Sequence, residues 1–351
     1  MPGSTKIAIP EGSRVLVTGV NGFVASHVAS QLLARGFKVR GTVRDLERTS
    51  WVINDTFKTY AERGDFEVVE IQDFTADGVY DNAVKGVSAI AHVASVVTFA
   101  PDPETVIPQT VAATVRIMEA ALKEPSVKAF VYTSSIAAVT MSVPGNTTHV
   151  DRNTWNDKAT QLAWSPPPPP HDQNTQGSMV YMASKVAAEK AVWKFVEEKA
   201  PHFRVNSVCP SMIMGEPLNN THLESVGAWL RYLWDGNVSN IARFPATFHI
   251  DVKDVALLHV AAILDPTVKN ERLQAWAENC NWNDILAIMR RLYPQHHFVE
   301  DFPDATKLSI TTDFTLPLSL LKKWGDQAGW RTLEQTVPDN VNPLAERELK
   351  A

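Results

Sequence analysis

A tyrosine and a lysine stand four residues apart in a segment with helical spacing. Tyr181 and Lys185 lie in YMASK, and Ala188, Val192 and Phe195 continue the same face at intervals of three or four residues. A phenol with a pKa of about 10 transfers protons poorly at neutral pH, and a nearby cation lowers that pKa by favouring the phenolate. The spacing therefore predicts a Tyr–Lys pair for proton transfer, with an ordinary surface pair on a helix as the alternative.

A glycine turn near the start of the chain offers a second kind of chemistry. Gly19, Gly22 and Ala25 form G-x-x-G-x-x-A, between the short apolar run 15–17 and a helical pattern that begins at Phe23. The open N–H groups and the dipole of such a helix favour a pyrophosphate, and glycines leave room for it. The motif predicts a dinucleotide site, and a purely structural turn is the alternative.

Two arginines indicate which dinucleotide is bound. In dinucleotide-binding folds an acidic residue at the end of the second strand accepts hydrogen bonds from the ribose 2′-OH. Here the predicted strand 37–43 is followed by Arg44, with Arg48 one predicted helical turn further on, while Asp45 is expected to point elsewhere. Guanidinium groups bind phosphate, so we predict NADPH, unless Arg44 only caps a solvated loop.

The pattern of apolar residues predicts the elements that position these groups. Apolar runs predict strands at 15–17, 37–43, 66–71, 86–94, 127–133 and 203–209, and helical spacing predicts helices from 23, over 46–63, 104–124 and 179–199. This alternation is typical of an α/β fold with a doubly wound parallel sheet, the Rossmann architecture. We assign 1–210 to that domain and 211–351 mainly to a smaller substrate-binding lobe, from which part of the chain returns to the first domain.

The C-terminal part is harder to interpret from periodicity. We expect a strand and a helix over 249–264, a strand at 273–276, a helix over 281–293 and a terminal helix around Leu320. The stretch 144–177 interrupts the alternation and contains five consecutive prolines, Pro166–Pro170, which favour an extended polyproline segment. This excursion is either a lid or a solvated spacer.

Composition excludes several classes of protein. The chain has 351 residues, 44% of them hydrophobic, and a formal charge of −6, which argues against nucleic acid or an anionic membrane as partner. No apolar run is long enough for a membrane span or a signal peptide, and the two cysteines, Cys209 and Cys280, suit a reducing cytoplasm. His296 and His297 have no third ligand at a suitable spacing, so we expect no metal.

Three motifs taken together resemble one family. TGVNGFVASH, the TSS after the fifth predicted strand and YMASK occur in the order and at the distances of an extended short-chain dehydrogenase/reductase. Within that superfamily the chain is similar to the dihydroflavonol reductase-like branch, which includes fungal aldehyde and ketone reductases of the methylglyoxal reductase type. GVSAIAHVASVVTF, HIDVKDVALLH and GWRTLEQTV extend the similarity over nearly the whole chain.

The resemblance implies a catalytic group and an activity. Ser135, with Ser134 as the adjacent alternative, would hydrogen-bond the carbonyl of the substrate; Tyr181 would donate the proton, and Lys185 would bind the nicotinamide ribose and lower the phenol pKa. Independently of the resemblance, the place of Phe99 just after the fourth predicted strand suggests that it lines the substrate site. The reaction implied is the NADPH-dependent reduction of an aldehyde or ketone to an alcohol.

The resemblance also implies the cofactor contacts. Besides Tyr181, Lys185 and the two arginines, they lie at the carboxyl ends of the predicted strands and in the glycine turn. They are Gly19, Gly22, Phe23, Val24, Asp73, Phe74, Val93, Ala94, Ser95, Thr133, Pro210 and Met212.

Two other functions stay open at this point. A nucleotide-sugar epimerase or dehydratase would need arginine and asparagine contacts to a diphosphate, and a catalytically silent cofactor-binding regulator would not need the Ser–Tyr–Lys set. The part of the chain after Pro210 is rich in Trp, Met and Phe, which favours an apolar small-molecule carbonyl substrate. The protein would be a monomer, or a homodimer through the helices 104–124 and 179–199.

Overall fold

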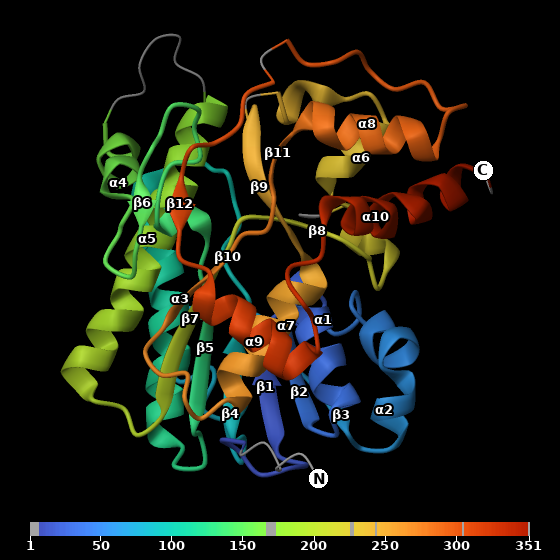
Figure 1. The fold of residues 1–351 in the computed structure, drawn as a ribbon. Helices are drawn as coiled ribbons and strands as arrows, with labels where there is room; N and C mark the ends of the chain where they lie inside the picture. Colours follow the sequence, from blue (N-terminus) through green and yellow to red (C-terminus); the bar gives the residue numbers. More distant parts are fainter. Residues whose placement is uncertain (1–6, 166–172, 225–227, 243, 304, 350–351) are drawn as a thin grey trace. The chain divides into compact units, whose positions relative to one another are not determined.

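The computed structural model describes residues 7–165, 173–224, 228–242, 244–303 and 305–349 (Figure 1). The chain divides into two compact units. The first consists of Met1–Met141, Arg152–Cys209 and His259–Leu273, and the second of Ser142–Asp151, Pro210–Leu258 and Gln274–Ala351. The polyproline segment and its role as a lid or spacer fall outside the described residues and stay predictions.

A seven-stranded sheet forms the centre of the first unit, and the strand that closes one edge runs on into the second unit. The strand order is β10-β7-β5-β4-β1-β2-β3, and the pairs β1–β2, β1–β4, β2–β3, β4–β5 and β5–β7 are parallel. The strands are β1 Arg14–Val17, β2 Lys38–Val43, β3 Phe66–Glu70, β4 Ala89–His92, β5 Ala129–Thr133, β7 Arg204–Pro210 and β10 Arg272–Ala275. Because the order reverses between β1 and β4, the carboxyl ends of these two strands form the place where doubly wound sheets bind ligands. The predicted Rossmann architecture is confirmed.

Helices cover both faces of this sheet. The helices that precede β7 in the chain are α1 Phe23–Ala34, α2 Lys58–Glu62, α3 Pro103–Lys123, α4 Asp157–Ala163 and α5 Gln173–Lys199, with the short π-helix η1 Val52–Thr56 and the short 3-10 helix η2 Ile136–Ala138. Figure 1 shows α3 and α5 side by side. Side chains alternate along a strand, so Leu16 packs toward α3 while its buried neighbours Val15 and Val17 point to the other face.

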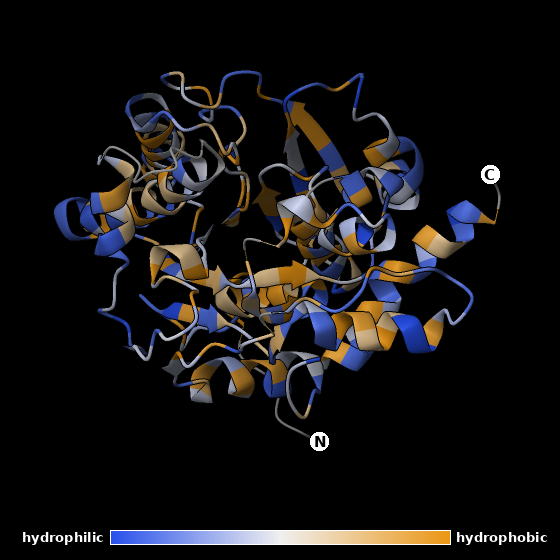
Figure 2. Ribbon diagram, turned by 90° about the horizontal axis from the view of Figure 1, so that it is seen from above, coloured by the Kyte–Doolittle hydropathy of each residue, from blue (hydrophilic) through white to orange (hydrophobic). Residues whose placement is uncertain are grey.

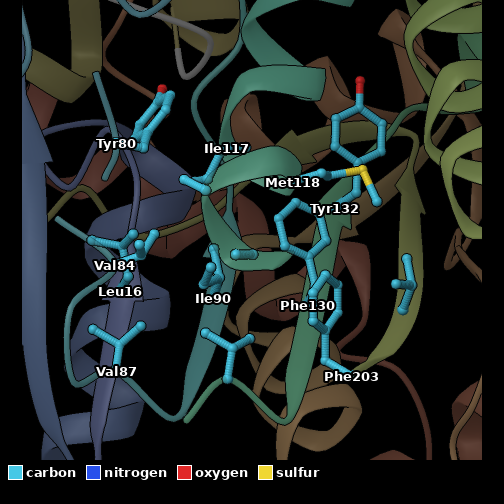
Figure 3. Close-up of a cluster of buried hydrophobic side chains, with 14 of the residues drawn as sticks. Leu16, Tyr80, Val84, Val87, Ile90, Ile117, Met118, Phe130, Tyr132 and Phe203 are labelled. Atoms are coloured by element: carbon cyan, nitrogen blue, oxygen red, sulfur yellow. The ribbon is translucent and has the colours of Figure 1, made fainter. Parts of the chain in front are cut away.

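The core between the sheet and the α3–α5 pair is built from apolar side chains of separate segments. Leu16, Ile90 and Phe130 come from β1, β4 and β5, and Ile117 and Met118 come from α3 (Figure 3). All five are fully buried. This packing fixes the position of α5 relative to the carboxyl ends of β4 and β5, which is where the predicted catalytic residues lie.

Two predictions about local structure are corrected. The segment 46–63 is not one helix, because it consists of turns, a short π-helix at η1 and α2. The stretch 144–177 is not irregular throughout, since it contains the strand β6 His149–Val150, the helix α4 and the start of α5, six residues before the predicted Met179. Asn156 caps α4 by accepting a hydrogen bond from the Ala159 N–H (3.2 Å), a signal that the polar composition of the stretch concealed.

The second unit contains two small sheets and several helices. β11, β9 and β8 form one sheet, with β8–β9 parallel and β11–β9 antiparallel, and β12 pairs with β6 in parallel. The strands are β8 Met212–Met214, β9 Ala246–Asp251, β11 Asn279–Asn281 and β12 Thr311–Thr312. The helices are η3 Asn220–Glu224, α6 Ala228–Trp234, η4 Val238–Asn240, α8 Trp282–Leu292, α9 Thr315–Gly325 and α10 Leu333–Glu348, together with α7 Val252–Leu264, whose second half belongs to the first unit.

Two motifs of the sequence meet inside the second unit. Arg331 of GWRTLEQTV donates from Nε to Asp251 Oδ2 (2.9 Å) and from its backbone N–H to Asp254 Oδ2 (2.7 Å), and both carboxylates belong to HIDVKDVALLH. Thr336 Oγ1 also donates to Asp251 Oδ2 (2.9 Å). The two carboxylates are fully buried, and such groups are stable only when paired in this way. These motifs therefore stabilise the fold of the second unit.

Hydropathy differs between the elements of the structure. Within the described ranges, the helices that are long enough for a bilayer are not apolar enough to cross one. Figure 2 shows both hydrophilic and hydrophobic stretches on the helices, as expected where one side packs and the other is solvated.

Candidate active site

The predicted catalytic residues come together at the carboxyl end of β5 and on the facing turn of α5. Tyr181 and Lys185 lie one turn apart on α5, and Ser135 follows β5 directly. The Ser135 hydroxyl lies beside the Tyr181 phenol and acts to lower its pKa. Lys185 Nζ donates to Ser95 Oγ (2.9 Å), after β4, and to the Thr133 carbonyl (3.4 Å), at the end of β5. Hydroxyl, phenol and ammonium thus occupy one edge of the sheet.

The two adjacent serines have different partners. Ser135 is half-buried and begins η2, where its Oγ accepts the Ala137 N–H (3.1 Å). Ser134 is buried and donates to Glu189 Oε2 (2.7 Å), away from the phenol. Alternation along an extended backbone explains this, since successive side chains point to opposite sides. The geometry favours Ser135 over Ser134 as the residue that meets a substrate.

The pKa of Tyr181 differs from the prediction. We expected Lys185 to lower it, whereas burial raises the pKa of this phenol and the hydrogen bond from Ser135 opposes the rise. Two donors of the Lys185 ammonium are directed to Ser95 and Thr133. Burial keeps Tyr181 in its protonated form, which is the form that a proton donor requires.

The glycine turn has the conformation that its motif predicts. Gly19 has φ +67°, and a Cβ there would come within 3.1 Å of the Ala94 Cβ. The Gly22 N–H donates to the Gly19 carbonyl (2.8 Å), and α1 begins directly after Gly22. The first turn of α1, which starts at Phe23 and Val24, contains only uncharged residues, so the positive end of the helix dipole is not neutralised by its own side chains. The donor set fits a pyrophosphate.

A buried threonine that the sequence analysis did not select joins the ends of β1 and β4. Thr18 Oγ1 accepts the N–H groups of Val93 (3.0 Å) and Ala94 (2.9 Å) and lies 3.0 Å from His92 Nδ1. Burial lowers the pKa of His92 to about 3, so this imidazole is neutral. The contact holds the segment 93–95 beside the glycine turn. The sequence signal that could have identified Thr18 is a polar residue at the end of an apolar strand, directly before Gly19.

The residues predicted to bind the adenosine part of the cofactor lie at the carboxyl ends of β2 and β3. Arg44 is exposed and follows β2. Arg48 lies in a turn and not on a helix, and its Nε is 3.4 Å from Asp45 Oδ2. Arg48 is therefore not one helical turn beyond Arg44, as predicted, and Asp45 has a partner of opposite charge. Asp73 follows β3 and accepts from Thr75 (Oγ1, 2.6 Å), which lowers the pKa of its carboxyl.

The remaining predicted residues have varied surroundings. The Phe99 ring lies with its centroid 5.3 Å from that of Tyr181 and is 43% exposed, so an apolar surface borders the phenol. Phe74 packs against the core of the first unit. Thr133 Oγ1 hydrogen-bonds His259 Nε2 (2.7 Å) on α7. Pro210 and Met212 belong to the second unit, where Met212 packs against the apolar core.

The described residues contain no group of three or more His, Cys, Asp or Glu side chains that could hold a metal ion. His296 instead packs against Trp234, with ring centroids 4.1 Å apart, and hydrogen-bonds the Trp234 carbonyl (2.9 Å). Burial raises the pKa of the Cys209 thiol to about 12, so it is un-ionised at neutral pH.

Comparison with known proteins places the chain in a family. Residues 15–274 match the NAD dependent epimerase/dehydratase family. The chain belongs to this family. It is 37% identical over 340 residues to aldehyde reductase 2 of Sporidiobolus salmonicolor, with 95% of this chain and 96% of that protein covered. It is 33% identical over 340 residues to the ketoreductase adrE of Penicillium rubens, with 95% and 97% covered. The predicted resemblance to extended short-chain reductases is confirmed.

Two solved structures share the fold of this chain. The yeast methylglyoxal/isovaleraldehyde reductase Gre2, complexed with NADPH, has a TM-score of 0.78 at 24% identity, covering 96% of this chain and 100% of that one. Vestitone reductase from alfalfa has a TM-score of 0.75 at 22% identity, covering 96% and 99%. These two proteins therefore share with this chain the central parallel sheet and flanking helices.

Proposed function

We propose that this protein is an NADPH-dependent reductase of aldehydes or ketones. The observation that carries the proposal is the geometry at the end of β5, where the Ser135 hydroxyl lies beside the Tyr181 phenol and Lys185, one turn further along α5, donates to Ser95 Oγ (2.9 Å). A regulator without catalysis has no need of this set. Relatives named aldehyde reductase and ketoreductase support the proposal.

The chain's own groups have distinct roles in this reaction. The reduced nicotinamide supplies the hydride to the carbonyl carbon when it is bound. Ser135 would hold the carbonyl oxygen, and Tyr181 would give its phenolic proton to the same oxygen as negative charge develops there, so that an alcohol results. Lys185 and Ser95 would bind the hydroxyls of the nicotinamide ribose, which positions the reacting atoms.

The pyrophosphate and the 2′-phosphate would be held at separate ends of the site. The α1 N-terminus after Gly22 would bind the pyrophosphate through backbone N–H groups. Arg44 would bind the 2′-phosphate, because its position at the end of β2 is exposed and Asp45, the nearby carboxylate, is paired with Arg48. An uncompensated acid at this position would repel the phosphate.

Arg44→Ala is expected to raise the NADPH dissociation constant about ten- to a hundredfold. A lost charge-assisted contact to phosphate costs about 1.5–3 kcal/mol, and NADH, which lacks that phosphate, should bind almost as before. Both constants can be measured by fluorescence titration. Arg63→Ala, which removes another exposed arginine of the first unit, serves as the matched control. Equal losses of affinity for NADPH and NADH would show that Arg44 does not bind the 2′-phosphate.

The substrate is proposed to be an apolar aldehyde or ketone. Phe99 next to Tyr181 gives the phenol an apolar neighbour, and such surfaces bind desolvated ligands. We expect NADPH oxidation with aldehydes, α-dicarbonyls or β-ketoesters in a spectrophotometric panel. Turnover of a sugar nucleotide, together with inactivity toward every small carbonyl, would instead support an epimerase or dehydratase.

We also propose a reducing compartment such as the cytoplasm. Both thiols, Cys209 and Cys280, are buried and form no disulfide in the described chain. The proposed oligomeric state is a monomer, or a homodimer formed through α3 and α5.

A further inference from the structure

A buried ion pair lies one helical turn beyond Lys185, and the proposed reaction does not use it directly. Glu189 on α5 is 0% exposed, and the Arg272 side chain, at the start of β10, is 4% exposed. The guanidinium holds the carboxylate with two hydrogen bonds, from Nε to Oε1 (2.9 Å) and from Nη2 to Oε2 (3.0 Å). Both residues belong to the first unit.

Both members of the pair have further partners. Glu189 accepts from Ser134 Oγ (2.7 Å) and Ser207 Oγ (2.7 Å), so it connects α5 to the end of β5 and the middle of β7. Arg272 Nη1 donates to the carbonyl of Thr154 (2.8 Å), and its guanidinium lies 3.9 Å from the centre of the Trp155 ring. A buried pair of this kind is often replaceable by apolar residues without loss of stability, so stability alone is a weak reason for it.

The charges around Lys185 show what Glu189 can do. The groups that face the ammonium within the described chain are His92 on β4, the Tyr132 ring on β5, the Cys209 thiol on β7, and Tyr181 and Glu189 on α5. His92, Cys209 and Tyr181 are neutral for the reasons given above. Glu189 is therefore the anion of this set, and Arg272 keeps it ionised.

We propose that Glu189, held by Arg272, is a positioning residue with two roles. It keeps the Lys185 ammonium protonated, and it holds the side chain of Ser134, the residue directly before Ser135. The inference rests on the proposed reductase function. Burial lowers the pKa of Lys185 to about 8, and the Glu189 carboxylate opposes that fall. Without Glu189 the ammonium would lose its proton at a lower pH.

The test is the pH profile of carbonyl reduction by the complete enzyme. In Glu189→Gln the alkaline limb of kcat should move to lower pH by about one unit, because a neutral amide no longer stabilises the ammonium. At the acidic end of the profile, where Lys185 is protonated in both proteins, kcat should return to near the wild-type value, and KM for the carbonyl should change little.

Two further variants separate charge from packing. Glu189→Gln/Arg272→Met removes both charges, avoids an unpaired guanidinium if the single variant folds poorly, and should show the same shifted limb. Ser207→Ala removes one hydrogen bond to the Glu189 carboxylate but leaves the charge of that carboxylate. The alkaline limb of the kcat profile of this variant should therefore stay at its wild-type pH.

The possible results distinguish this inference from the proposed function. If the alkaline limb of both Glu189 variants stays at its wild-type pH, and kcat falls equally at every pH, the Glu189–Arg272 pair has only a structural role. Wild-type enzyme that reduces no carbonyl with NADPH would remove the proposed function, and the inference with it.

Discussion

Tyr181→Phe is expected to lower kcat for carbonyl reduction by about 10²–10⁴-fold, the usual contribution of a positioned general acid. The substitution removes the phenolic proton and leaves the ring that packs against Phe99. NADPH binding should stay almost unchanged, because the proposed ribose contacts come from Lys185 and Ser95. Single-turnover oxidation of NADPH, with a fluorescence titration of the cofactor beside it, measures both quantities.

The matched control is another buried phenol of the first unit. Tyr80 lies in the core shown in Figure 3, and Tyr80→Phe removes a hydroxyl far along the chain from α5 while keeping the ring. Its turnover should match the wild type. If Tyr181→Phe turns over as fast as this control, the proton comes from another group and the catalytic assignment is wrong.

Phe130→Ala is expected to lower the free energy of unfolding by about 3–5 kcal/mol. Phe130 is 0% exposed on β5, and its ring contacts those of Phe203 and His92 at centroid distances of 6.2 and 6.1 Å. Truncation leaves a cavity between the sheet and the α3–α5 pair, since close-packed neighbours relax only in part. Urea unfolding followed by circular dichroism measures the change.

Phe99→Ala is the control for this effect, because it removes the same side chain from an exposed position. Its unfolding free energy should fall by less than about 1 kcal/mol, as exposed substitutions usually do. A loss in Phe130→Ala no larger than that in Phe99→Ala would contradict the packing described for the core.

Local patterns in the sequence were sufficient for the elements that carry the site. The glycine turn before Phe23 and the Tyr181–Lys185 spacing are short-range signals, so β1, α1 and the catalytic turn of α5 were predicted. Adding Ser135 depended on the family resemblance, since a serine after a strand is common. What the sequence could not show was the partner of each serine, which depends on where α5 packs.

Other features depend on contacts between distant residues. The pKa of Tyr181 was predicted in the wrong direction, because desolvation by the folded chain raises it and outweighs the lowering by the Ser135 hydroxyl. The pairing of Arg48 with Asp45 depends on a turn that helical spacing concealed. Glu189 and Arg272 are 83 residues apart in the sequence, so no local pattern could pair them.

The division of the first unit into three chain segments has a consequence for synthesis. A ribosome releases Glu189 well before Arg272, and Pro210–Leu258 of the second unit emerges between them. Until β10 arrives, β7 has an open edge, with backbone groups available to other chains, and the Glu189 carboxylate lacks its cation. The nascent protein therefore cannot finish one unit before starting the next, and it is most exposed to aggregation while residues 210–272 are being made.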